Sequence, residues 1–158
     1  MLVKPKYIIV SVSLSINLLL ASCSDSKVAQ CERLVKQVSQ GTALLEKNKG
    51  SQVTTSLQLA KDLQDVTKKV SDLKFGDEKL QELQSKFVKI FENLSQNIDK
   101  AGKALSTAKS AQATASGRET IQKARGDIDT SLKAASDSAK QFDVSVTELN
   151  QYCSKPES

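Results

Sequence analysis

Three cysteines, Cys23, Cys31 and Cys153, are the residues of this 158-residue chain that are best suited to covalent chemistry. A cysteine thiolate can attack an electrophile, bind a metal ion or form a disulfide with a second thiol. Cys23 directly follows an apolar run, whereas Cys31 and Cys153 stand near the two ends of the remaining chain. These settings predict one role for Cys23 and another for the other two.

The segment before Cys23 has the pattern of a signal peptide. Lys4 and Lys6 give it a basic start, and an apolar run from Tyr7 to Ala21 follows, diluted by three serines and one asparagine. A membrane-spanning helix needs about 20 predominantly apolar residues, so this shorter run disfavours the alternative of a spanning segment. We expect residues 1–22 to be a signal peptide that is removed.

The motif Leu20-Ala21-Ser22-Cys23 has a branched apolar residue and two small residues before the cysteine, and it resembles the lipobox of bacterial lipoproteins. The resemblance implies that a diacylglycerol is attached to the Cys23 thiol and that cleavage follows Ser22. Residues 23–27 would be a lipidated tether, held in the lipid bilayer through acylated Cys23; the alternative is a free, buried cysteine after an ordinary secretory signal. In a Gram-negative cell, Ser24 implies the periplasmic face of the outer membrane rather than the inner membrane.

Cys31 and Cys153 form an even pair in a chain that we expect to be exported. Outside the cytoplasm such a pair favours a disulfide. A bond between positions so far apart would contribute on the order of 4 to 5 kcal/mol in the chain-entropy account. The alternatives are two free thiols or a redox pair, and the sequence has no Cys-x-x-Cys motif that would favour the latter.

The segments that must position these cysteines have the apolar spacing of amphipathic helices, and no stretch alternates like a strand. The expected core stripes include Val28 near the start and Leu132 in the last segment. The signals that separate the four segments are Asn48-Lys49-Gly50, Phe75-Gly76 and Ser116-Gly117. We predict an all-α fold over residues 28–153, an antiparallel, coiled-coil-like four-helix bundle running up-down-up-down, with a tail at 154–158.

The number of helices and the disulfide constrain each other. An even number of antiparallel helices returns Cys153 to the end where Cys31 lies, whereas three helices would separate their Cα atoms far beyond the bridging limit of about 7 Å. At 1.5 Å per residue, the first two segments reach about 33 Å and the last two about 50 Å. We therefore expect the second hairpin to project away from the membrane, with the alanine-rich stretch 101–116 at its tip.

Composition removes several classes of activity. The chain has no histidine, which excludes histidine-based triads, metal sites and pH switches, and it has no glycine-rich phosphate loop. Of its 23 basic and 18 acidic residues, two lysines would leave with the signal peptide, so three positive charges remain in excess. That small surplus is typical of a mixed, solvated surface and does not indicate a nucleic acid as partner. We expect no enzymatic activity, no cofactor and no metal site.

Basic clusters such as Lys86 and Lys89 have two interpretations. A solvated helix face explains them, and contact with anionic lipid head groups is the alternative. Phe87 and Phe142 are expected to fill the core.

Four features occur together in this sequence: the lipobox, a second cysteine eight residues after the first, the helical run at 77–96 and Tyr152-Cys153. The combination resembles small helical lipoproteins of cyanobacteria over most of the mature chain, and the resemblance implies no known activity. We expect a non-enzymatic cell-envelope lipoprotein that binds or scaffolds, with an envelope protein as partner at the hairpin tip. The alternative is a carrier or sensor of a small apolar ligand, held between the helices beside Phe87 and Phe142.

Overall fold

The computed structural model describes residues 26–48 and 53–155 of the chain. They form four α-helices, α1 (Lys27–Lys47), α2 (Val53–Ser71), α3 (Glu78–Ser110) and α4 (Ala115–Cys153), and the described residues contain no strand. The prediction of an all-α helical bundle is confirmed.

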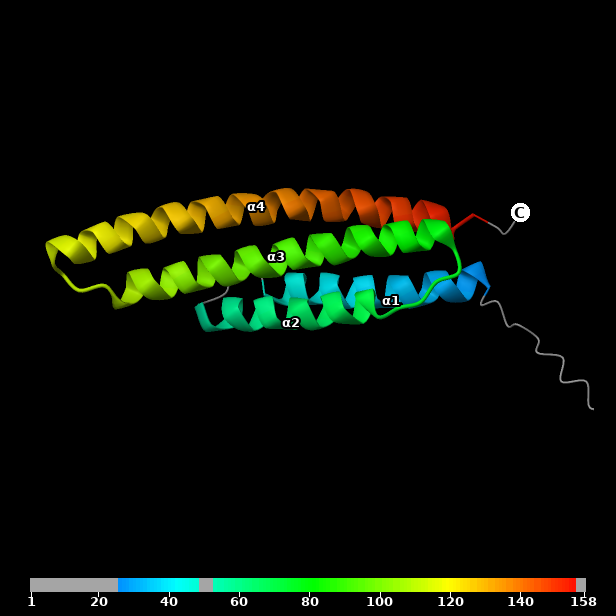
Figure 1. The fold of residues 1–158 in the computed structure, drawn as a ribbon, viewed down its shortest axis with the longest axis horizontal. Coiled ribbons are helices and arrows are strands. Elements are labelled where there is room, and N and C mark those ends of the chain that lie inside the picture. The colour runs from blue at the N-terminus through cyan, green and yellow to red at the C-terminus, as the bar shows by residue number, and fades with distance from the viewer. Residues whose placement is uncertain (1–25, 49–52, 156–158) are drawn as a thin grey trace, which may run out of the picture.

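Two antiparallel hairpins of unequal length lie side by side (Figure 1). Helices α3 and α4 have 33 and 39 residues, against 21 and 19 residues for α1 and α2. The short hairpin packs beside the part of the long hairpin where α3 begins and α4 ends, and α2 contacts α1 and α3. The long hairpin therefore projects beyond the short one, as the segment lengths predict.

Side-chain caps set the starts of three helices. Ser26, Asp77 and Thr114 each accept a hydrogen bond from the amide three residues later, at 3.2, 2.9 and 3.1 Å. Such caps satisfy amides that have no partner within the helix.

The turn predicted at Ser116-Gly117 is wrong, because Thr114 caps α4 and the connection lies at 111–114. Gly117 lies within the first turn of α4 instead. A Cβ atom there would overlap the carbonyl group of Gln112, so this glycine allows the chain to fold back closely.

Three phenylalanines form the centre of the core. The ring of Phe142 in α4 lies 5.8 Å from that of Phe87 and 5.5 Å from that of Phe91, both in α3, between ring centroids. Phe87 and Phe91 are fully buried. The rings pack against one another in the space beside Phe87 and Phe142, where the alternative hypothesis puts an apolar ligand.

Helix α4 packs on α3 through small residues at a strict spacing of seven. Its buried residues include Gly117, Ala124, Ser131, Ser138 and Ser145. A repeat of seven keeps one side of a helix facing its neighbour, and Leu132 lies one residue outside this row. The prediction that Leu132 and Val28 belong to the core is wrong, since they are 53% and 58% exposed.

Candidate functional site

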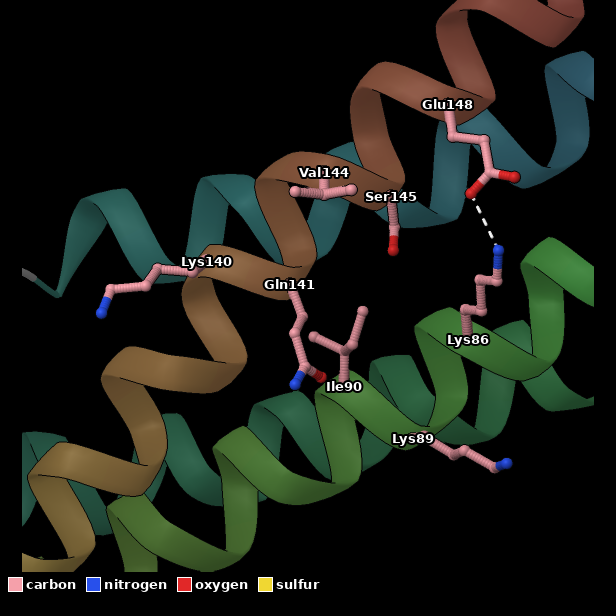
Figure 2. Close-up of a pocket in the computed structure, with 8 residues that line it drawn as sticks. All are labelled: Lys86, Lys89, Ile90, Lys140, Gln141, Val144, Ser145 and Glu148. Carbon is pink, nitrogen blue, oxygen red and sulfur yellow. Dashed lines mark hydrogen bonds and ion pairs between the residues drawn. The ribbon is translucent and has the colours of Figure 1, made fainter.

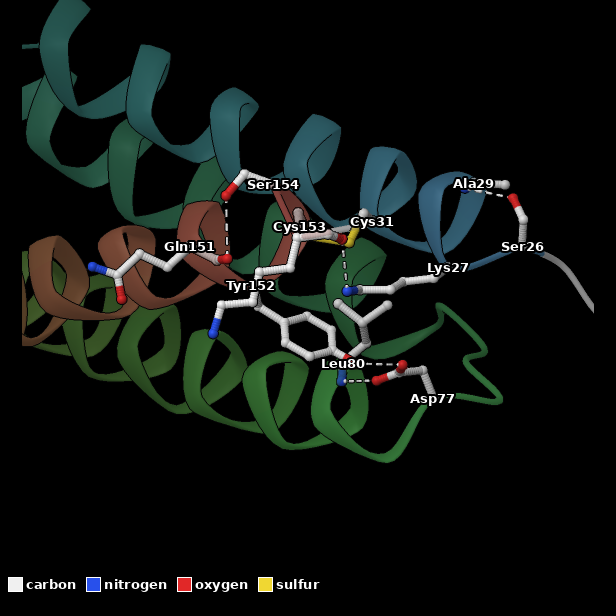
Figure 3. The surroundings of a disulfide bond; sticks show 11 residues. Ser26, Lys27, Ala29, Cys31, Asp77, Leu80, Gln151, Tyr152, Cys153 and Ser154 are labelled. Atoms are coloured by element: carbon white, nitrogen blue, oxygen red, sulfur yellow. Dashed lines mark hydrogen bonds between the residues drawn. A yellow bond between two sulfur atoms is a disulfide. The ribbon is translucent and has the colours of Figure 1, made fainter. Parts of the chain in front are cut away.

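The two cysteines of the predicted pair join at the end of the bundle where α1 begins and α4 ends (Figure 3). Their Cα atoms lie 5.8 Å apart, within the usual range for a disulfide, although 122 positions separate them in the sequence. The Cys31–Cys153 disulfide predicted from the cysteine count is therefore present in the structure. Cys23, the predicted lipidation site, lies outside the described residues.

A tyrosine beside the disulfide holds the end of α4 to the start of α3 (Figure 3). The Tyr152 hydroxyl donates a hydrogen bond of 2.6 Å to Asp77, whose other oxygen caps α3 by accepting from the Leu80 amide. Partial burial raises the pKa of Asp77, but hydrogen bonds, first the one from Tyr152, outweigh it and leave that pKa below its usual value. The same bond raises the pKa of the Tyr152 hydroxyl.

A buried glutamine completes this arrangement. Gln30, only 7% exposed, accepts hydrogen bonds from the amides of Gly76 (2.8 Å) and Asp77 (3.1 Å), which ties α1 to the connection between α2 and α3. The sequence prediction missed Gln30, because apolar spacing does not reveal a buried amide; its position beside Cys31 is the one available signal. We call Gln30, Cys31, Asp77, Tyr152 and Cys153 the locked end.

A furrow runs between α3 and α4 and opens on the side away from α1 and α2 (Figure 2). One hollow in this furrow has a volume of about 440 Å³. Its lining includes the aliphatic side chains of Ile90 and Val144 as well as three lysines. Val144 is 68% exposed, the most exposed large hydrophobic residue among those described. The residues that line this hollow are Lys86, Lys89 and Ile90 of α3 and Lys140, Gln141, Val144, Ser145 and Glu148 of α4.

A cluster of four charges stands at the end of this hollow nearest the locked end. Glu148 binds Lys79 at 2.6 Å and Lys86 at 2.9 Å, and both lysines also bind Glu82, at 2.8 and 2.7 Å. Hydrogen bonds from Lys79 and Lys86 lower the pKa of Glu148 and bring the pKa of Glu82 to about 2. Hydrogen bonds to Glu148 and Glu82 raise the pKa of Lys79 to about 12. All four groups are therefore charged at neutral pH, and the cluster joins α3 to α4.

This cluster predicts a loss of stability in acid. Because both carboxyl groups have a lower pKa in the folded protein than the ordinary value of 4.5, their contribution is complete above that pH and is lost as the pH falls toward 2. Urea titration at several pH values measures the free energy of unfolding. We expect this free energy to fall less steeply between about pH 4.5 and 2 in Glu148→Gln than in the unmodified protein. A control variant, Glu46→Gln on α1, should keep the slope of the unmodified protein; equal slopes in all three proteins would contradict the prediction.

The predicted hairpin tip has no comparable arrangement of groups. Residues 103–116 are mostly small and partly or fully exposed. Gly102 still lies under α2, where a Cβ atom would come within 3.0 Å of the Leu57 side chain. Helix α2 therefore still covers α3 at Gly102, at the start of the predicted tip.

The described part of the chain has neither a metal-binding cluster nor a membrane span. No three of its histidine, cysteine, aspartate and glutamate side chains could together hold a metal ion. None of its helices is both long and apolar enough to span a membrane.

Comparison with known proteins adds no relative. No protein-family model, curated protein or solved structure matches the chain. Function is therefore inferred from the locked end, the furrow and the projecting hairpin.

Proposed function

We propose that the protein is a non-enzymatic lipoprotein of the cell envelope that is anchored through acylated Cys23 and uses its long hairpin to bind or scaffold another protein. The observation that carries this proposal is that the start of α1 and the end of α4 lie together. Helix α1 begins at Lys27, four residues after Cys23, and α4 ends beside it at the disulfide. The connection between Cys23 and α1 can span at most about 14 Å, so the locked end would stay near the bilayer.

The long hairpin points away from that end (Figure 1). With 39 residues, α4 is about 58 Å long, so its tip would lie well beyond the lipid head groups. Two acyl chains are enough for stable attachment of such a domain. In a Gram-negative cell, Ser24 favours the periplasmic face of the outer membrane as its place.

The state of the reactive groups supports a binding role. Cys31 and Cys153 are both used in the disulfide. The carboxyl groups of Asp77, Glu82 and Glu148 have lowered pKa values, whereas a general acid needs a raised one. These groups stabilise the bundle and are poorly suited to proton transfer.

Metabolic labelling with an alkyne-bearing fatty acid tests the anchor. We expect label on the unmodified protein in the membrane fraction, and none on Cys23→Ser, because serine lacks the thiol that accepts lipid. The variant Cys31→Ala with Cys153→Ala is the control, and it should be labelled like the unmodified protein. Label that persists in Cys23→Ser would rule out Cys23 as the acceptor.

Photocrosslinking in intact cells tests the binding role at the tip. A photoreactive residue at exposed Gln112 should form a discrete adduct with an envelope protein. The same residue at exposed Glu46, on α1, is the control and should not. The same adducts from both positions, or none from Gln112, would contradict a partner site at the tip.

A further inference from the structure

We propose that the furrow between α3 and α4 is a docking groove for an acidic amphipathic helix of a partner protein. This inference rests on the proposed binding function and assigns it a surface and a partner chemistry. The locked end is not part of this surface, but the surface extends into the first residues of the predicted hairpin tip, Lys103, Ala104 and Thr107.

The furrow repeats itself along α3. A second hollow nearer the tip is lined on its α3 side by Lys100, Lys103, Ala104 and Thr107. Lys100 and Lys103 follow Lys86 and Lys89 by fourteen positions, which is two heptads and returns to the same helix face. Two pairs of lysines thus stand on one side of the furrow, about 21 Å apart.

The α4 side repeats at the same interval. Asp127 and Ser131 line the second hollow, and Gln141 and Ser145 take the equivalent places in the first. Because both walls repeat at the same interval, we take the two hollows as two parts of one groove along α3 and α4. A ligand that used both would have to be extended and regular, which suits a helix laid along the groove between two others.

The groove is positively charged. Five lysines and two carboxylates line the two hollows. Three of the lysines are already in ion pairs: Lys86 with Glu82 and Glu148, Lys103 with Asp99, and Lys140 with Asp137. The excess positive charge is therefore carried by Lys89 and Lys100. Lys89 and Lys100 form no ion pair with other described residues. Charge complementarity therefore favours an acidic partner. Because Val144 is exposed in the groove, the partner helix should also carry an aliphatic side chain between its acidic residues.

The position of the lysines favours a protein over the anchoring membrane. Lys89 lies twelve residues along α3 from the cap Asp77 at the locked end, or about 18 Å, and Lys100 about 35 Å. With the locked end at the membrane, the lysines of the second hollow would be far from the lipid head groups. A helix from a neighbouring protein has no such restriction.

A synthetic helical peptide tests this assignment. The probe carries two pairs of glutamates two heptads apart with a leucine between them, and its binding to the full-length protein in detergent is followed by fluorescence anisotropy at low salt. We expect Lys89→Glu with Lys100→Glu to weaken binding at least about tenfold. The control pair Lys36→Glu with Lys61→Glu, exposed on α1 and α2, changes the net charge equally and should alter affinity less than about twofold.

Four results would overturn the proposal. Equal weakening by both pairs of substitutions, or equal binding of a peptide whose glutamates are moved to different faces, would reduce the effect to net charge. A dimer that Lys89→Glu with Lys100→Glu dissociates in sedimentation would assign the furrow to a second copy of this chain. Furrow-dependent binding to vesicles of anionic phospholipid, with no peptide binding, would assign it to lipid. Because the titration needs no anchor, its failure would leave the Cys23 labelling result unaffected, and the reverse also holds.

Discussion

Replacing Cys31 and Cys153 together by alanine is expected to lower the free energy of unfolding by about 4 to 5 kcal/mol. The disulfide joins residues 122 positions apart, so its loss gives the unfolded chain a large gain in conformational entropy. Urea unfolding followed by circular dichroism measures the change. Because the disulfide joins α1 to α4, amide hydrogen exchange should rise most in α1, while α3 and α4 stay protected by their mutual packing.

Reduction provides the matched control for this prediction. A dithiol reductant should lower the stability of the unmodified protein to that of the double alanine variant and leave the variant unchanged. Cys23→Ser, which keeps the disulfide, should unfold like the unmodified protein. A loss below about 1 kcal/mol, or two free thiols in non-reducing mass spectrometry of the protein from cells, would contradict this role for the disulfide.

Gly41→Ala is expected to destabilise the protein by about 1 to 3 kcal/mol, although alanine is the better helix former. Gly41 lies in the middle of α1, and a Cβ atom there would overlap the ring of Phe91. That ring cannot move aside easily, since it packs against Phe142 at 5.5 Å and Phe87 at 6.4 Å. Overpacking of the aromatic core should therefore outweigh the gain in helix propensity.

The same substitution at Gly126 should have the opposite sign. Gly126 lies within α4, and no atom lies within 4 Å of the place that its Cβ would take. Gly126→Ala should stabilise the protein by about 0.5 to 1 kcal/mol in the same urea experiment. Phe91→Leu in the Gly41→Ala background should recover part of the lost stability, and a double-mutant cycle measures that coupling. Stabilisation by Gly41→Ala would show that the ring yields.

Much of the fold could be predicted because it depends on local pattern and composition. Apolar residues at helical spacing predict the four helices, and the even cysteine pair together with an even helix count predicts which ends meet. The exact turn could not be predicted, because Ser116-Gly117 carries turn residues while the Thr114 cap decides where α4 begins. A glycine needed for close approach and a glycine needed for a turn look alike in a sequence.

The errors in the core have a related cause. A stripe counted by apolar character includes Leu132 and omits Ser131 and Ser138, which are 5% and 6% exposed. A serine can be buried in a helix when its hydroxyl has a partner, and Ser138 donates to the carbonyl of Ala134 at 3.0 Å. Close packing of α3 on α4 favours small side chains over large ones at these positions.

The candidate site was predictable only in part. Lys86 and Lys89 stand out as a basic cluster in the sequence, but their meaning depends on which α4 residues lie opposite. Val144 and Lys140 are brought there by the register of two long helices, which no local pattern encodes. The repeat of the lysine pair at Lys100 and Lys103 is the one sequence signal that could have indicated a groove.

The large separation of the two bonded cysteines also means that Cys31 is synthesised well before Cys153. At synthesis rates of about 5 to 20 residues per second, the 122 positions between Cys31 and Cys153 correspond to about 6 to 24 s. During that interval the residues of α1 have been synthesised but the end of α4, to which the disulfide joins them, has not. Cys23 is the other cysteine that has been synthesised by then. If Cys23 is acylated within those seconds, as the proposed function requires, Cys31 has no other cysteine to pair with before Cys153 is made.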